Sequence, residues 1–166
     1  HRVYPLETRR AWMRGLRADA NETYLFHGTR GAVVDIVSAV GFEERVCSPN
    51  SLFGSAIYFG ENSTKSYEYC AKDERTGRCS LFLARVTLGH VHETATELMQ
   101  TRRPPCIQGH RDPEICAHRR ADSVVAVTRK TNPNAAVGKY REIMVYDRRQ
   151  AYPEYLVEFE RVEADQ

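Results

Sequence analysis

Short apolar runs separated by polar turns dominate the chain, a pattern that predicts strands more often than helices. The runs are rich in aromatic and β-branched side chains, which favour buried strands. The predicted strands cover residues 23–27, 56–59, 80–88, 123–127, 141–147 and 154–162. From about residue 90 to 120 the chain turns polar and rich in proline, arginine and histidine, which predicts a long irregular loop.

Helical periodicity is confined to a few segments. Residues 33–40 carry an apolar stripe with helical spacing, followed by Gly41 as a predicted C-terminal cap. The stripe consists of Val33, Ile36, Val37 and Val40. Residues 61–71 predict a second helix, which Asn62 or Ser63 would cap, and residues 5–17 predict an opening helix. Several strands, few helices and no regular strand–helix alternation predict an α+β domain.

The composition excludes several classes of protein but adds no detail about the fold. The 166 residues predict one domain, and 42% hydrophobic with 28% charged residues is typical of a globular protein, not of a disordered tail, a collagen-like fibre or a coiled coil. No apolar run approaches the ~20 residues of a membrane helix, so no membrane partner is expected. A net charge of +2 does not by itself indicate nucleic-acid binding.

Arginines nevertheless gather in two segments, where a solvated face is favoured and a phosphate-binding patch stays the alternative. They are Arg9, Arg10, Arg14 and Arg17, and then Arg102, Arg103, Arg111, Arg119 and Arg120. The five cysteines are odd in number and scattered, which favours reduced thiols and hence an intracellular protein. A disulfide between Cys70 and Cys79 stays open.

One cysteine–histidine cluster invites a comparison with zinc sites. The spacing between its members is three, five and one residues, which fits no common zinc pattern and favours an ordinary loop. The members are Cys106, His110, Cys116 and His118.

Three polar clusters beside predicted strands carry the chemistry. His27-Gly28-Thr29 ends one strand, and the glycine would let a ligand approach the backbone closely. Tyrosines on residues 54–59 and on the following helix could clamp a flat cationic ring. Glu142 is a lone carboxylate at the start of an apolar strand. Taken singly, each has a plainer interpretation: a half-buried histidine, core aromatics, or a charge that protects an edge strand.

The order of the motifs resembles the catalytic domain of the poly(ADP-ribose) polymerase family, the diphtheria-toxin-like ADP-ribosyltransferases, from about residue 24 to the end. The matching pieces are 25–29 (LFHGT), 41–45 (GFEER), 53–59 (FGSAIYF), 61–66 (ENSTKS), 85–89 (RVTLG), 122–124 (DSV) and 142–146 (EIMVY). The ending 150–156 (QAYPEYL) looks like the tankyrase branch in particular.

The resemblance implies two packed small β-sheets with flanking helices and an NAD+ cleft between them. Residues 1–22 would be a helical lead-in, and residues 23–166 the catalytic domain. The enzyme would cleave nicotinamide from NAD+ and transfer ADP-ribose to protein acceptors, which can include itself. It would need no metal, because the stretch between Cys70 and Ser80 lacks the histidine of the tankyrase zinc site.

The resemblance also assigns roles residue by residue. His27, Tyr58 and Glu142 would form the catalytic set. Other residues would bind NAD+ by stacking, through the backbone or through a hydroxyl. The nicotinamide would be held by Gly28, Ser66 and Tyr69, with Tyr58 on the opposite side of its ring. The adenosine-side ribose would be held by His27 and Thr29, with Lys65 beside the ADP portion or an acceptor.

Glutamate at position 142 permits chain elongation in the family, so synthesis of poly(ADP-ribose) is expected. The loop 128–140 would then form the acceptor wall, with Arg129, Lys130 and Lys139 facing a pyrophosphate. Two alternatives stay open. One is a mono-ADP-ribosyltransferase, including one that acts on nucleic-acid ends, and the other is a binding module that keeps the cleft but has lost turnover.

Overall fold

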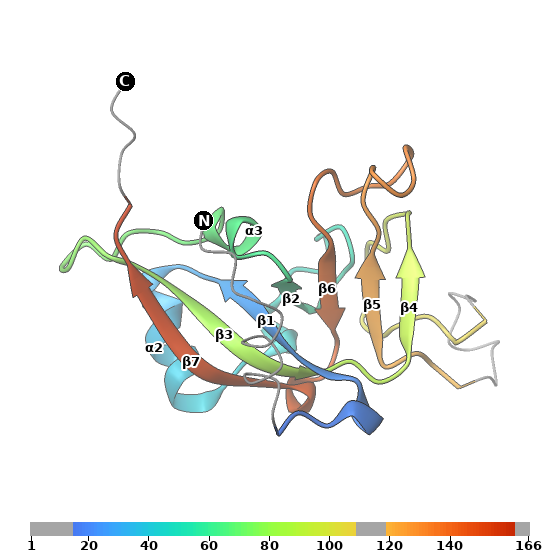
Figure 1. The fold of residues 1–166 in the computed structure, drawn as a ribbon, viewed down its shortest axis with the longest axis horizontal. Coiled ribbons are helices and arrows are strands. Elements are labelled where there is room, and N and C mark those ends of the chain that lie inside the picture. Colours follow the sequence, from blue (N-terminus) through green and yellow to red (C-terminus); the bar gives the residue numbers. More distant parts are fainter. Residues whose placement is uncertain (1–14, 109–118, 162–166) are drawn as a thin grey trace.

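The computed structural model of the chain describes residues 15–108 and 119–161. Seven strands form its sheet in the order β4-β5-β6-β2-β1-β3-β7 (Figure 1). The strands are β1 (Glu22–Gly28), β2 (Ile57–Gly60), β3 (Cys79–Thr87), β4 (Val91–Thr94), β5 (Ser123–Ala126), β6 (Glu142–Val145) and β7 (Ala151–Phe159). The helices are η1 (Ala18–Ala20), α2 (Gly31–Val40), η2 (Glu44–Val46), α3 (Ser63–Tyr67) and η3 (Arg148–Gln150).

The sheet has two halves that run in different directions (Figure 1). One half is the long antiparallel set β1, β3 and β7, and the other consists of β2, β6, β5 and β4, with β4 parallel to β5. A single registered pair, Phe26 with Gly60, joins β1 to β2. The α+β class is confirmed. The two small sheets expected from the sequence are joined into one hydrogen-bonded order, because this one pair bridges them.

Helix α2 forms where the periodicity predicts it, but its buried face differs. Val34 and Val37 are buried in the cluster beneath the helix, whereas Ile36 is 59% and Val40 72% exposed. The expected stripe was therefore wrong in all but Val37, because α2 meets the sheet along a narrow face that two positions fill. Gly41 does end the helix, with φ of 82° and its N–H donated to Val37.

Helix α3 is shorter than the predicted segment 61–71. Asn62 caps it as expected, accepting from the Thr64 N–H at 2.9 Å. The helix ends at Tyr67, and beyond it the Arg161 guanidinium donates to the Cys70 carbonyl oxygen at 2.6 Å. That contact joins the segment after α3 to the residues that follow β7.

Among the described residues, the two larger of three buried clusters lie on the sheet beside the cavity-forming elements, and the third gathers Cys70, Cys79 and Leu81. The first lies between the sheet and α2 and includes Phe42 and Phe82. The second packs Phe53 against β5 and β6, where Val124 and Met144 are fully buried. Each such side chain stabilises the fold by about 1.5–3 kcal/mol.

The remaining expectations from the sequence concern a missed strand, two cysteines and segments outside the described residues. Strand β4 was missed, because its sequence VHET carries no apolar run. Cys70 and Cys79 are free thiols. The opening helix expected over residues 5–17 lies almost wholly outside the described residues, as do His110, Cys116 and His118. No helix within the described ranges is long and apolar enough to cross a membrane.

Candidate active site

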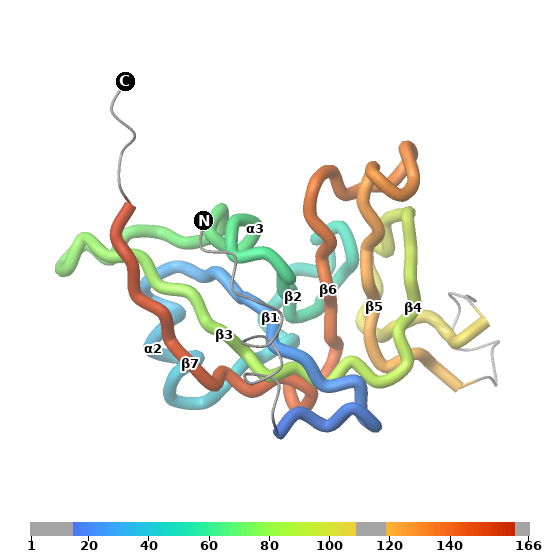
Figure 2. Tube along the Cα trace, viewed as in Figure 1, coloured from blue at the N-terminus to red at the C-terminus, as the bar shows by residue number. Residues whose placement is uncertain are grey.

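A cavity of about 390 Å³ lies at the junction between the two halves of the sheet. Its walls come from segments far apart in the sequence: the end of β1, strand β2, helix α3, the start of β6 and the cleft loop, by which we mean residues 43–56 (Figure 2). All predicted site residues except Thr29 line it. The lining residues named from the sequence are His27, Gly28, Tyr58, Lys65, Ser66, Tyr69 and Glu142.

His27 is fixed in one orientation. Its Nδ1 lies 2.8 Å from the carbonyl oxygen of Tyr58, and its ring packs edge-on against Phe42. Burial lowers the pKa of His27, so the ring is neutral at pH 7. A carbonyl can only accept, so Nδ1 carries the proton and Nε2 is left as an acceptor. Such a nitrogen can bind a hydroxyl group.

The hydroxyl of Tyr58 is fully engaged with the cleft loop. It accepts from the Phe53 N–H at 2.9 Å and donates to the Gly54 carbonyl at 3.0 Å. Burial raises the pKa of Tyr58 to about 12. The group therefore keeps its proton at neutral pH, and what Tyr58 offers to the cavity is its aromatic face.

Glu142 is buried at the start of β6 and pairs with Lys65. The Glu142 Oε1 lies 3.1 Å from the Lys65 Nζ, which also contacts Glu68 at 3.1 Å. Although burial opposes the charge of Lys65, these two carboxylates raise its pKa, so the ammonium stays charged. The same Nζ lies 5.2 Å from the ring centroid of Tyr69, whose side chain is 57% exposed at the mouth.

Gly28 and Ser66 bring β1 and α3 into close contact. The Ser66 hydroxyl donates to the Phe26 carbonyl at 2.9 Å, which leaves its lone pairs free to accept. A Cβ on residue 28 would lie 1.8 Å from the Ser66 carbonyl oxygen, so only glycine fits. The backbone of β1 is thereby exposed to the cavity without a side chain over it.

A second cavity of about 330 Å³ adjoins the first. Leu52, Lys65 and Glu142 line both, so they form the partition between them. Of the cations expected on the acceptor wall, Lys139 lines this second cavity, whereas Arg129 and Lys130 do not. The Arg129 Nε instead donates to the Ala135 carbonyl of its own loop at 3.1 Å.

Cys47, Ser51 and Leu52 of the cleft loop line the first cavity and received no role from the sequence. Burial raises the pKa of the Cys47 thiol, whose Sγ donates to the Glu43 carbonyl at 3.7 Å. Within residues 15–108 and 119–161, no group of three or more His, Cys, Asp or Glu side chains could hold a metal ion.

Relatives with curated descriptions match most of the chain. Mouse "Protein mono-ADP-ribosyltransferase PARP12" is 28% identical over 144 residues, covering 85% of this chain and 17% of that protein. Mouse "Protein mono-ADP-ribosyltransferase PARP11" is 29% identical over 158 residues, covering 84% of this chain and 42% of that protein. The chain thus spans well under half the length of either relative.

These relatives do not support the tankyrase branch expected from residues 150–156. In the structure, the first residue of this motif has a role in the fold. The Gln150 carboxamide donates to the carbonyl oxygens of Thr87 and Asp122, at 3.0 Å each, and so ties the residue before β7 to the end of β3 and to the residue before β5.

The sequence model described as "Poly(ADP-ribose) polymerase catalytic domain" matches residues 6–161, nearly the whole chain. This match confirms the enzyme class expected from the motifs, an NAD+ ADP-ribosyltransferase with NAD+ as co-substrate. The chain belongs to the poly(ADP-ribose) polymerase catalytic domain family.

Proposed function

We propose that this chain transfers single ADP-ribose units from NAD+ to protein acceptors. The observation that carries the proposal is the meeting of His27, Tyr58 and Glu142 in one cavity with a buried carboxylate. The printed names of both relatives, mono-ADP-ribosyltransferases, favour single transfer over the elongation expected from Glu142. Because the chain spans only part of each relative, its own activity needs a direct test.

The lining of the cavity fits the parts of NAD+. The rings of Tyr58 and Tyr69 offer aromatic faces for a flat cationic ring. The Ser66 hydroxyl can accept from a carboxamide, and the bare backbone at Gly28 can bond the same group. The Nε2 of His27 can accept from a ribose hydroxyl, since its Nδ1 is already bound.

Glu142 supplies the electrostatic contribution to the reaction. Loss of nicotinamide builds positive charge on the ribose, as in glycoside hydrolysis. A buried carboxylate that bonds the ribose stabilises this charge as it develops, and it can also polarise the incoming acceptor group. Lys65, paired with Glu142 at 3.1 Å, holds the carboxylate in position before substrate binds.

The test is transfer from NAD+ labelled on its adenylate portion, with products resolved on a denaturing gel. Glu142→Gln keeps the shape of the side chain and removes its charge, so the rate should fall by about a hundredfold, as for comparable electrostatic groups. Arg149→Ala is the control, because Arg149 is exposed and pairs with Asp147 in its own segment.

The form of the labelled product decides between the alternatives. A single sharp protein band that is lost in Glu142→Gln is the expected result. A ladder would instead establish elongation, and label on an added oligonucleotide rather than on protein would redirect the proposal to nucleic-acid ends. Absence of label in an otherwise NAD+-binding protein would favour a binding module and contradict the proposal.

A further inference from the structure

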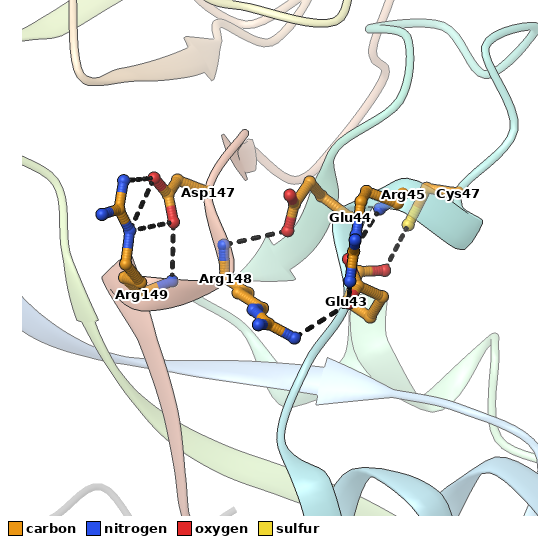
Figure 3. A network of polar contacts seen from close by, with 7 residues as sticks. All are labelled: Glu43, Glu44, Arg45, Cys47, Asp147, Arg148 and Arg149. Carbon is orange, nitrogen blue, oxygen red and sulfur yellow. Dashed lines mark hydrogen bonds and ion pairs between the residues drawn. The ribbon is translucent and has the colours of Figure 1, made fainter.

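A network of charged and polar groups joins the cleft loop to the segment that follows β6 (Figure 3). The Arg148 Nη1 lies 3.1 Å from the Glu43 Oε2, and the Arg148 backbone N–H donates to the Glu44 Oε2 at 3.0 Å. Glu43 and Glu44 open the cleft loop, whereas Arg148 opens η3. The two segments lie 105 residues apart in the sequence, so these contacts are tertiary rather than local.

This network lies between the cleft loop, which lines the cavity, and the strand that carries Glu142. Glu43 caps η2, and the turn that it starts leads directly to Cys47, which lines the cavity. Arg148 follows β6, the strand that starts at Glu142. The network therefore sets the position of the first part of the cleft loop relative to the strand that carries the catalytic carboxylate.

The rest of the cleft loop has other attachments. Leu52 accepts from the Leu98 N–H through its carbonyl at 2.8 Å, and Phe53 accepts from the Tyr146 hydroxyl at 2.7 Å. Those bonds hold the far end of the loop. At its beginning, the loop follows Phe42, which is buried in the core, and Arg148 adds the contacts to the segment after β6.

We propose that Arg148 is a positioning residue for NAD+, whose guanidinium holds the start of the cleft loop against the segment after β6 through Glu43. The bond from the backbone N–H of residue 148 to Glu44 is kept in Arg148→Ala, so that variant tests the guanidinium alone. This inference rests on the proposed function for its substrate. Arg148 touches neither the cavity nor the reacting atoms, so it acts through the loop. Its guanidinium should affect the binding of NAD+ much more than the chemical step.

Neighbouring arginines provide matched controls. Arg149 has an exposed side chain whose guanidinium pairs with Asp147, two residues away, at 2.5 Å (Figure 3). Arg45 pairs with Glu43 at 2.6 Å within the loop itself. Neither pair joins the loop to η3. Removal of either guanidinium therefore deletes an ion pair of similar length without deleting the link.

The experiment measures KM for NAD+ and kcat from nicotinamide release, and Kd for carba-NAD+, an analogue that cannot lose nicotinamide. For Arg148→Ala we expect KM and Kd to rise about fivefold, the upper effect of one partly exposed ion pair, with kcat within about twofold of wild type. Arg148→Lys should recover part of the loss, because an ammonium can still pair with Glu43. Arg149→Ala and Arg45→Ala should resemble wild type.

The outcomes separate the inference from the proposed function. Unchanged Kd in Arg148→Ala, or an equal loss in Arg149→Ala, would overturn the inference. If Arg148→Ala does not fold, Glu43→Gln removes the same ion pair and must show the rise in Kd. A wild-type chain that binds carba-NAD+ but releases no nicotinamide would overturn the proposed function, while the Kd comparison would still decide the role of Arg148. No binding at all would overturn both.

Discussion

The cavity has two walls that are built by different means. The wall formed by β1, β2 and β6 is set by strand register, and its side chains follow from backbone pairing such as Phe26 with Gly60. The cleft loop has no such ladder beside the cavity. It is held by scattered backbone bonds, such as that from the Leu98 N–H to Leu52, and by the side chains of Tyr58 and Arg148. A register resists single substitutions, whereas a loop held by side chains can be loosened by one. The first wall should therefore fix the chemistry, and the second should tune affinity.

The largest effect should come from breaking the strand wall at Gly28. A methyl group there would meet the Ser66 backbone, which cannot yield without moving α3. Gly28→Ala should lower the free energy of unfolding by about 3 kcal/mol and abolish NAD+ binding, as measured by urea denaturation and calorimetry. Gly31→Ala is the control, since its nearest neighbour, Asp73, would lie 3.7 Å away. Because Gly31 starts α2, alanine there should be stabilising by about 0.5 kcal/mol.

Removal of the Tyr58 hydroxyl, which holds the loop wall, should lower the free energy of unfolding by a smaller amount. Tyr58→Phe removes the partner of the Phe53 N–H and of the Gly54 carbonyl. A cost of about 1–3 kcal/mol in unfolding free energy is expected, because the N–H is left without an acceptor. Tyr152→Phe, on an exposed tyrosine of β7, should leave the urea midpoint unchanged. Equal midpoints for the two variants would show that the loop does not depend on this hydroxyl.

The pH dependence of NAD+ binding should come from the strand wall, through His27, and not from the loop wall. The folded-state pKa of His27 lies below 6.5, so the neutral ring and the stability it brings are present above pH 6.5 and are lost as pH falls through the folded pKa. Below that folded pKa, Kd should rise about tenfold per pH unit, because Nε2 gains a proton and stops accepting.

The loop should not contribute to this pH profile. Hydrogen bonds from Arg45 lower the pKa of Glu43 to about 2, so its carboxylate stays charged until far more acidic conditions. His27→Gln should therefore flatten the profile below pH 6.5. Retention of the full pH dependence in that variant would place the titrating group elsewhere.

The smallest expected effect is a difference in how salt changes the Kd for carba-NAD+ in wild type and in Arg148→Ala. The Arg148–Glu43 pair is partly exposed and is therefore screened. Raising sodium chloride from about 0.05 to 0.5 M should weaken wild-type binding of carba-NAD+ by about twofold more than it weakens binding by Arg148→Ala. Salt also acts directly on the anionic ligand, but it does so equally in both proteins, so that contribution cancels in the ratio of their Kd values. A constant ratio of the two Kd values would mean that the ion pair does not hold the loop.

The sequence predicts what local patterns encode. The strands at residues 23–27, 56–59 and 141–147 are apolar runs, and the polar residues beside them mark His27, Tyr58 and Glu142. What it misses depends on contacts between distant segments. Nothing near Arg148 indicates that Glu43 is its partner, and Val34 rather than Ile36 is buried only because of where α2 meets the sheet. Likewise, nothing near α3 indicates that Arg161 bonds the Cys70 carbonyl just beyond the helix.

The single Phe26–Gly60 pair also bears on how the domain opens and closes in solution. The first buried cluster packs across both halves, but so little backbone is shared between them that the amide protons beside the junction can exchange by local opening. A dinucleotide bound across the junction would contact both halves and oppose this opening. The co-substrate would then act as a structural link, and slow amide exchange near Gly60 would report its occupancy before any chemistry occurs.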